Sequence, residues 1–441
     1  MQGQTIRDGE VEIEYTSKAL SGWGGLTLFF EFVRERGMFK VLERILPSKK
    51  RSPNQIASLD IIKTLFGAVL VGGNRFAHIE RVRDDEVIRT LMGAERIGGS
   101  DTARRYFDGL TRSECEELYG DLQQSMRTTL WSEISEDVLD LDSTILERYG
   151  RQQGVSKGYH TARAGQLSHH PLLAMLAQSK QIVHIWLRAG GASTLRGPAQ
   201  FIAEVVAQLP ERLRITAVRA DSGFHTEEFV GSLETRGIDY MVAVRMHPPM
   251  KKLAEKTSQQ QWARLDDDHQ IADLRYRAPN WAKERRVLLI RRAILRKGAL
   301  FDTIDYEYNA LVTSLTMSAT ECSNFYDQRG DCENTIKEFK NDFGADGFCM
   351  NSFYATEIVL RLIAALFNLI TAFKRQVLRD PTVTLGTVRI KVFVVGAMLG
   401  RHARSTVLRL GLNRRWKEHF ATLLARCAPS TPTAAQSAFS T

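Results

Sequence analysis

The feature that most constrains the fold is an alternation of strand-like and helix-like segments that begins at Val138. The segments DVLDLDSTILERYG, PLLAMLAQ, QIVHIWLRAG and LRITAVRADSGF contain the short runs of branched and aliphatic residues that are typical of strands. Helical patterns over 199–208 and 226–236 separate the later strands, and IDYMVAVRM follows as another strand. This order predicts an α/β domain with a mixed central sheet.

The segments on either side of this domain have different patterns. Apolar residues recur at three- and four-residue steps over 26–45, 58–71 and 116–130, which predicts a helical N-terminal region. Residues 247–310 carry β-branched and aromatic residues in short runs without a sustained helical period, which predicts a β-rich insertion. Two long helices are expected after it, over 318–343 and 358–378.

A chain of 441 residues is expected to form more than one core. We predict a helical N-terminal region over 1–130 and an α/β domain built from 131–246 and 311–380, interrupted by the insertion 247–310. A C-terminal region over 381–427 contains TVRIKVFVVGAMLG, read as a strand or buried segment, and the basic helix RRWKEHFATLLARC. The low-complexity residues 428–441 are expected to be a disordered tail.

The composition favours a soluble protein with a polyanionic partner. Lys and Arg number 60 against 51 Asp and Glu, which gives a net charge of +9 and favours phosphate neutralisation. Five scattered cysteines lack zinc-ligand spacing and are expected to be reduced thiols. The apolar stretch 358–373 contains Arg361 and Asn368 and is shorter than the ~20 residues of a membrane span. It predicts a core helix, no membrane partner and a cytoplasmic location.

A possible DNA reader lies near residue 100. Gly98 and Gly99 break the chain, and Ser100-Asp101 offers an N-cap for the helix that follows. A turn followed by a helix that bears Arg104 and Arg105 suits a helix-turn-helix DNA-binding motif. An arginine pair on the solvated face of an ordinary helix explains the same residues equally well.

The predicted helix 318–343 carries one carboxylate among cations. Tyr326, Arg329, Glu333, Lys337 and Lys340 fall within a stripe of roughly 80° on a helical wheel. A separate apolar stripe lies beside it, so that one face packs and the adjacent face presents the charged groups. Glu333 and Lys337 also have the spacing of a surface ion pair, so a solvated, salt-bridged face remains the alternative.

Two aspartates lie where an α/β sheet positions functional groups. Asp142 lies in the strand DLDST, and Asp221 ends the strand AVRADSG; carboxylates at strand ends are often functional in open sheets. Asp140 shares a strand face with Asp142 and competes with it. We prefer Asp142 because the small Ser-Thr pair after it leaves room for a ligand. Together with Glu333, these acids suit Mg²⁺, and two such ions can promote an in-line phosphoryl displacement.

These residues also resemble a known family. Tyr326-x2-Arg329-x3-Glu333-x6-Lys340 resembles the tyrosine-arginine-glutamate-lysine signature of insertion-sequence DDE transposases. The contexts DLDST at Asp142 and RADSGF at Asp221, in that order before Glu333, match as well. The segment GYH…GQLSHHPLLAMLA and the helical N-terminal region are similar to the insertion-sequence thirteen-eighty branch. The resemblance covers nearly the whole chain except the tail.

The resemblance implies a ribonuclease-H-like catalytic domain with a β insertion between Asp221 and Glu333. The implied activity is excision of a mobile element at its terminal inverted repeats, with hairpin ends as intermediates, and joining to target DNA. Asp142, Asp221 and Glu333 would be the ligands of two Mg²⁺ ions, with Mn²⁺ as a substitute. The implied partners are double-stranded DNA and a second copy of the chain in a synaptic dimer. The implied location is the cytoplasm of a bacterium, at the nucleoid.

The resemblance further implies that Tyr326, Arg329 and Lys340 contact DNA phosphates, and Lys337 lies on the same face. Trp281, which Pro279 and the cations of KERR flank, is a candidate for stacking on a displaced base, although packing of the insertion explains it as well. Trp262 is the second choice for that role.

Several residues and functions stay open. His160, His169 and His170 lie in a Gly- and Ser-rich segment, and they and His225 remain unassigned. Two other functions are compatible with the sequence: a ribonuclease-H-like nuclease that cleaves without strand transfer, and a DNA-binding protein that has lost catalysis. Recovery of a joined DNA product excludes the first, and metal-dependent nicking excludes the second.

Overall fold

A computed structural model describes residues 4–6, 11–49, 52–158, 165–193, 195–296 and 303–428. The chain forms two compact units, one composed of Met1–Gly109 and Phe373–Thr441 and the other of Leu110–Ala372. This division differs from the predicted one, because the two ends of the chain share a unit and the helix predicted over 116–130 belongs to the central unit. All but the first residue of the predicted tail 428–441 lie outside the described residues.

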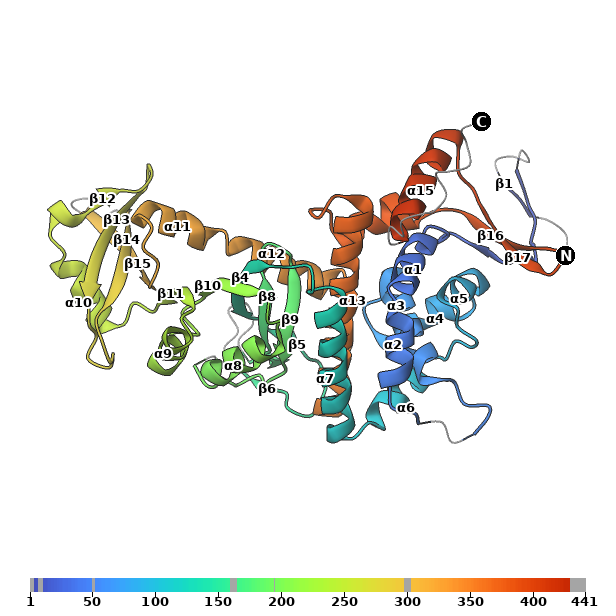
Figure 1. Cartoon of the computed structure of the whole chain (residues 1–441), viewed down its shortest axis with the longest axis horizontal. Coiled ribbons are helices and arrows are strands. Elements are labelled where there is room, and N and C mark those ends of the chain that lie inside the picture. The colour runs from blue at the N-terminus through green and yellow to red at the C-terminus, as the bar shows by residue number, and fades with distance from the viewer. Residues whose placement is uncertain are drawn as a thin grey trace, which may run out of the picture. The chain divides into compact units, whose positions relative to one another are not determined.

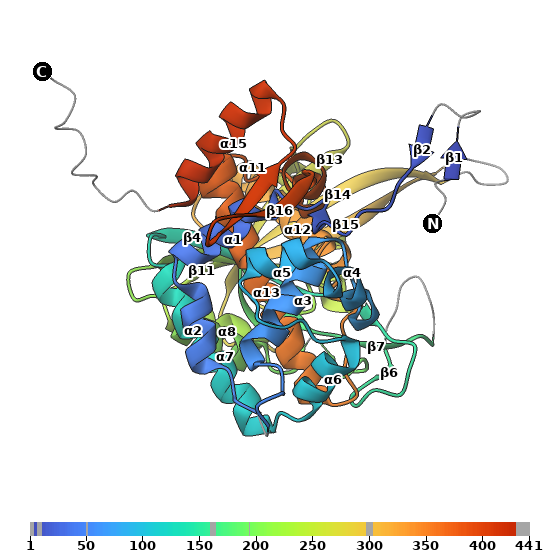
Figure 2. The ribbon, with the colours of Figure 1, turned by 90° about the vertical axis from the view of Figure 1, so that its right-hand side faces the viewer.

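The terminal unit contains a group of short helices that pack around the apolar helix α3 (Figure 2). Its helices from the N-terminal segment are α1 (Leu26–Glu35), α2 (Met38–Ile45), α3 (Ser58–Leu70), η1 (Phe76–Ile79), α4 (Glu80–Arg83), α5 (Glu86–Met92) and α6 (Ser100–Asp108). Those from the C-terminal segment are η3 (Lys374–Leu378), α14 (Leu385–Val388), η4 (Arg389–Phe393) and α15 (Arg414–Cys427).

Short strands complete the terminal unit. β1 (Gln4–Ile6) pairs with β2 (Val11–Ile13), and β16 (Ala397–His402) pairs with both β17 (Ser405–Leu410) and β3 (Leu20–Ser21). The segment 387–400, predicted as one strand or buried segment, is therefore part helix and part strand. The predicted N-cap at Ser100-Asp101 is also wrong: the cap residue of α6 is Gly99, which has no side chain to donate or accept a bond.

The central unit is built on a mixed sheet of nine strands in the order β12-β13-β14-β15-β11-β10-β4-β8-β9 (Figure 1). β4 (Glu136–Ser143), β10 (Arg214–Ala220) and β11 (Asp239–Val244) are parallel neighbours. β8 (Leu172–Leu176) and β9 (Gln181–Trp186) continue the sheet in antiparallel pairing. A separate small sheet contains β5 (Leu146–Glu147), β6 (Ser156–Lys157) and β7 (Leu167–His169). The predicted mixed α/β architecture agrees with this sheet.

The segment predicted as a β-rich insertion extends the same sheet. Its strands are β12 (Ala263–Arg264), β13 (His269–Tyr276), β14 (Arg285–Arg296) and β15 (Thr303–Thr313), preceded by α10 (Pro248–Lys256) and η2 (Gln259–Gln261). β15 pairs with β11, with Met241 opposite Thr313. This pairing satisfies the backbone groups of β11 that would otherwise form an open sheet edge.

Helices of the central unit pack against this sheet. They are α7 (Arg112–Thr129), α8 (Pro198–Gln208), α9 (Glu227–Thr235), α11 (Ala319–Asp327), α12 (Gly330–Asn341) and α13 (Phe353–Phe373). The single helix predicted over 318–343 is two helices. The α-helical hydrogen-bond pattern is interrupted at their junction, where Arg329 N donates to the carbonyl three residues earlier, Tyr326 O, at 2.9 Å. Gly330, a poor helix former, follows directly.

Helix α13 is apolar but lies in the protein core. The segment Phe353–Leu378 is long and apolar enough to cross a membrane, yet 89% of its most apolar window is buried inside the protein. Two of its buried polar side chains form hydrogen bonds within the central unit: Asn368 Nδ2 donates to Ile182 O at 2.8 Å, and Arg361 Nη2 donates to Ile185 O at 3.0 Å. These contacts are those of the core helix that the sequence predicts.

Candidate active site

Two aspartates meet at one edge of the central sheet. In the parallel pair of β4 and β10, Leu141 is in register with Ala220. Asp142 is the next residue of β4 and Asp221 is the first residue after β10, and adjacent strands lie about 4.8 Å apart. Because the carboxyl ends of parallel strands share an edge, the fold brings together two acids that are far apart in the sequence.

Asp142 is held in a buried position. Its carboxylate accepts a hydrogen bond from Ser143 N at 2.7 Å and forms an ion pair with Arg329 Nη2 at 3.0 Å. The residue is only 8% exposed. Burial raises the pKa of the Asp142 carboxyl to about 6, although Arg329 opposes the shift. A raised pKa means that the charged form of this buried carboxylate is destabilised, so a cation bound beside it would stabilise it.

Asp140, the competing residue, has different contacts. Its two oxygens accept from Arg219 Nε at 2.7 Å and Arg219 Nη2 at 2.8 Å, and Arg219 Nη1 donates to Phe325 O at 2.6 Å. Asp140 and Arg219 are both buried. Asp140 therefore belongs to a closed ion pair inside the unit, whereas Asp142 lines a cavity at the sheet edge.

Arg329 connects Asp142 to the third acid. It lies at the N-cap of α12, and its Nη1 reaches Glu333 Oε1 at 3.0 Å while its Nη2 reaches Asp142. Burial opposes the charge on this guanidinium, but the surrounding acids, Asp142 foremost, raise the pKa of Arg329 above its usual value. The Glu333 side chain is 64% exposed. One guanidinium thus bridges a buried and an exposed carboxylate.

The other residues of the predicted stripe have separate contacts. Tyr326, on α11, donates from its hydroxyl to Ala220 O at 3.2 Å, the residue before Asp221. Burial raises the pKa of Tyr326 to about 12, so the phenol stays protonated. Lys340 Nζ donates to Ile145 O at 2.8 Å. Lys337 is exposed on α12 and lines a cavity with Glu333.

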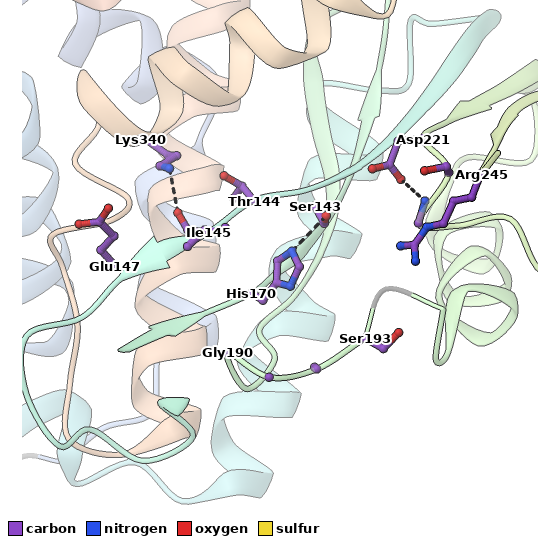
Figure 3. A pocket seen from close by; sticks show the side chains of 14 residues that line it. Ser143, Thr144, Ile145, Glu147, His170, Gly190, Ser193, Asp221, Arg245 and Lys340 are labelled. Carbon is purple, nitrogen blue, oxygen red and sulfur yellow. Dashed lines mark hydrogen bonds between the residues drawn. The ribbon is translucent and has the colours of Figure 1, made fainter. Parts of the chain in front are cut away.

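Two cavities meet at the end of β4. The smaller, of about 390 Å³, is lined by Asp142, Glu333, Lys337 and Lys340. The larger, of about 1060 Å³, we call the Arg245 groove; its lining includes Ser143, His170, Ser193, Asp221, Arg245 and Lys340 (Figure 3). Both cavities are lined by Ser143, Thr144 and Lys340. The acids therefore lie where two polar spaces join.

The sequence analysis missed Arg245 and left His170 unassigned. Arg245 follows directly on β11, the third parallel strand, so the same end-of-strand argument applies to it as to the two aspartates. His170 Nε2 lies 3.2 Å from Ser143 Oγ. Burial, with Arg188 nearby, lowers the pKa of His170, so this ring is neutral near pH 7.

Trp281 is buried in the insertion rather than exposed on its surface. It is only 4% exposed, and its ring packs against Tyr276, His225 and the guanidinium of Arg285. Burial to this degree favours the alternative that Trp281 packs the insertion, and its role in stacking on a displaced base stays a prediction. Trp262 is buried as well, at 7% exposure.

The remaining predicted residues belong to other parts of the chain than the three acids, which all lie in the central unit. Arg104 and Arg105 are exposed on α6 of the terminal unit. The Arg104 guanidinium lies 4.9 Å from the centre of the Phe76 ring, and Arg105 Nε donates to Asp101 O at 3.3 Å. His160 lies outside the described residues.

The donor set at the sheet edge suits a hard divalent cation. Asp142, Asp221 and Glu333 offer carboxylate oxygens, the ligand type that Mg²⁺ prefers. Arg329 already supplies a positive charge between Asp142 and Glu333, in the position where a cation is needed. In the described ranges no three acids, histidines or cysteines are close enough to form a ready-made metal cage. The residues fit a metal, provided that Arg329 moves from between them.

The chain matches a known protein family in sequence and is similar to solved structures. The family described as transposase DDE domain group 1 matches residues 4–432. No curated protein matches the chain in sequence. Among solved structures, the chain is similar to one described as a cryo-EM structure of the piggyBac transposase synaptic complex with hairpin DNA. The identity is 11%, the alignment covers 84% of this chain and 78% of that chain, and the TM-score is 0.48.

Proposed function

The chain belongs to the transposase DDE domain group 1 family, and from this membership we propose that it is the DNA transposase of an insertion sequence. It binds the terminal inverted repeats, cleaves the element ends by two-metal phosphodiester chemistry, with hairpin ends as intermediates, and joins them to target DNA. The proposal includes the insertion-sequence thirteen-eighty branch and a ribonuclease-H-like catalytic domain, which the mixed sheet with acids at its carboxyl edge supports.

One observation carries the proposal. Asp142 and Asp221 follow in-register positions on adjacent parallel strands, and one guanidinium links Asp142 to Glu333. Three carboxylates from two strand ends and a helix are what a site for hard cations requires. The large polar groove beside them has room for a polymer rather than only a small metabolite.

We assign Asp142, Asp221 and Glu333 as the ligands of Mg²⁺, with Mn²⁺ as a substitute. When bound, two such ions activate the attacking oxygen and stabilise the leaving oxygen of an in-line displacement. The protein's own contribution is to hold the acids at one sheet edge. Burial of Asp142 favours cation binding. Its charged carboxylate is destabilised by desolvation, and a divalent cation offsets this penalty more fully than the single charge of Arg329 does.

Tyr326, Arg329, Lys337 and Lys340 supply contacts to the DNA backbone. Lys337 is exposed and Lys340 lines both cavities, so their ammonium groups can reach phosphates near the acids. Arg329 is engaged with two carboxylates in the DNA-free protein. On metal entry it turns from these carboxylates to a phosphate, a bidentate partner that suits a guanidinium.

The terminal unit supplies sequence recognition, with Arg104 and Arg105 on α6 contacting the inverted repeat. The net charge of +9 supports a DNA partner. Two element ends must be brought together, so the active form with DNA is a dimer, and the protein acts in the bacterial cytoplasm at the nucleoid.

The test uses the full chain and a duplex that carries one inverted repeat from the DNA flanking the gene. Asp142→Ala, Asp221→Ala and Glu333→Ala each abolish Mg²⁺-dependent nicking but leave duplex binding largely intact, because metal ligands serve the chemistry and basic residues the affinity. Asp331→Ala, an exposed acid on the same helix as Glu333, is the matched control and keeps activity. Near-normal nicking by any of the three variants removes that residue from the site, and absence of nicking by the native protein refutes the proposed function.

A further inference from the structure

Of the signature residues, Glu333 lines only the smaller of the two cavities that meet at the acids, whereas Lys340 lines both. We propose that the Arg245 groove binds a second DNA strand, the one to which the element end is joined, through its backbone phosphates. The inference rests on the proposed function and adds a binding site to it. Arg245 is the residue that would hold this strand.

The position of the groove follows from the geometry of strand joining. In an in-line displacement, the attacking and leaving oxygens lie on opposite sides of phosphorus. Hydrolysis therefore needs one DNA strand and water, whereas joining needs space for two strands. Asp142 and Glu333 line the smaller cavity, Asp221 lines the groove, and Ser143, Thr144 and Lys340 line both.

The lining of the groove suits a sugar-phosphate backbone rather than a base. Its described lining contains the hydroxyls of Ser143, Thr144, Ser193 and Ser222 and no Phe, Tyr or Trp. Proteins usually hold an unstacked base between aromatic rings, so a flipped base has no platform here. At about 1060 Å³ the groove exceeds the usual size of a pocket for a small ligand.

Arg245 is free to bind a phosphate. It is exposed, and its guanidinium makes no hydrogen bond or ion pair with any residue that the structure describes. The guanidiniums of Arg219 and Arg329, by contrast, are engaged with carboxylates. Figure 3 shows Arg245 next to Asp221 at one end of the groove and Lys340 at the other, with His170 between them. A guanidinium at this position can take a phosphate bidentately.

The floor of the groove is held open by small residues. Gly191 N donates to Ser156 Oγ at 2.7 Å, and Arg188 Nη1 donates to Ser193 O at 3.0 Å. A Cβ on Gly190 would lie 2.2 Å from Ser168 O, so only glycine fits there. These contacts fix the loop without filling the groove, which leaves Ala192 as a half-buried position on the floor.

The reaction at this junction is a balanced transesterification. The oxygen of a 3′-hydroxyl on the element end forms a bond to a phosphorus of the second strand, and the bond from that phosphorus to its own 3′-oxygen breaks. The proton of the attacking hydroxyl passes to water, and the departing oxygen takes up a proton. No oxidant, reductant or nucleotide cofactor is consumed.

The test separates cutting from joining in the full-length protein. Nicking is measured on an uncut inverted-repeat duplex, and joining on a pre-cut duplex with a supercoiled plasmid as target, both in Mg²⁺. Arg245→Ala is expected to nick within about twofold of the native rate but to join at least about tenfold less, the loss of one charge-assisted phosphate contact. The salt dependence of plasmid binding should lose about one unit of slope.

A second variant and a control complete the design. Ala192→Glu puts a carboxylate on the groove floor and should also reduce joining more than nicking. Arg236→Ala removes one exposed arginine at the C-cap of α9, outside the groove, and should leave both steps unchanged. Joining by Arg245→Ala at the level of Arg236→Ala overturns the inference, as does an equal loss of nicking and joining. Absence of nicking by the native protein instead refutes the proposed function and the inference with it.

Discussion

Replacing Asp142 by Asn is expected to stabilise the metal-free protein while it abolishes cleavage. Burial raises the pKa of Asp142 from 3.8 to about 6, and one pKa unit corresponds to 1.36 kcal/mol. At pH 7 the charged carboxylate therefore costs the folded state up to about 3 kcal/mol relative to a neutral side chain of the same shape. Arg329 keeps Glu333 as a partner in the variant, so its guanidinium is not left unpaired.

The sign of the effect depends on pH in a defined way. Below about pH 4 Asp142 is protonated in both the folded and unfolded states, so native protein and Asp142→Asn should be equally stable. Between pH 4 and 6 only the folded state keeps the proton, and the native protein loses stability as the pH rises. The advantage of the variant should therefore grow through this window and then stay constant.

The assay is thermal or denaturant unfolding of both proteins in EDTA from pH 4 to 8. A gain of this size raises Tm by several degrees at pH 7, whereas Glu228→Gln, an exposed acid on α9, should change stability by less than about 0.5 kcal/mol. Added Mg²⁺ should stabilise the native protein and not the variant, because binding to the folded state adds stability by mass action. A variant less stable than native protein at pH 7 would refute the reasoning, since the ion pair with Arg329 would then outweigh the cost of burial.

Three further outcomes are expected. Asp140→Ala should destabilise the protein by about 3–5 kcal/mol in denaturant unfolding, because Arg219 is left buried without its carboxylate; a folded but inactive variant would instead place Asp140 in the catalytic site. The double variant of Arg104 and Arg105 to Ala should bind the inverted repeat more weakly and with a smaller salt dependence in gel shifts, and unchanged binding would move DNA contact elsewhere. Trp281→Ala should cost about 3–5 kcal/mol of stability and slow every DNA step alike, whereas a selective loss of hairpins would restore the base-stacking role.

Local patterns in the sequence were sufficient for much of the architecture. The periodicity after Val138 predicted the strands of a mixed sheet and the helices between them, since alternation and helical spacing are properties of neighbouring residues. The same reasoning put Asp142 and Asp221 at strand ends and Glu333 on a helix, as the structure has them. Their catalytic roles stay predictions that the variants above test.

Local patterns failed where the outcome depended on distant partners. That β15 pairs with β11 and extends the central sheet could not be read from either strand, because each strand edge accepts many partners. Trp281 has the flanking cations of an exposed residue, but packing of the insertion against His225 buries it.

The charged residues at the site show most clearly what the sequence determines and what depends on tertiary structure. The sequence by itself determined which side chains carry charge and on which elements they lie. Only the tertiary structure decided that Arg329 bridges Asp142 and Glu333, that Asp140 is neutralised by Arg219, and that Arg245 is left unpaired among the described residues. The physical reason is that ion pairing and burial depend on distances between residues far apart in the chain, and these distances exist only after the sheet has assembled.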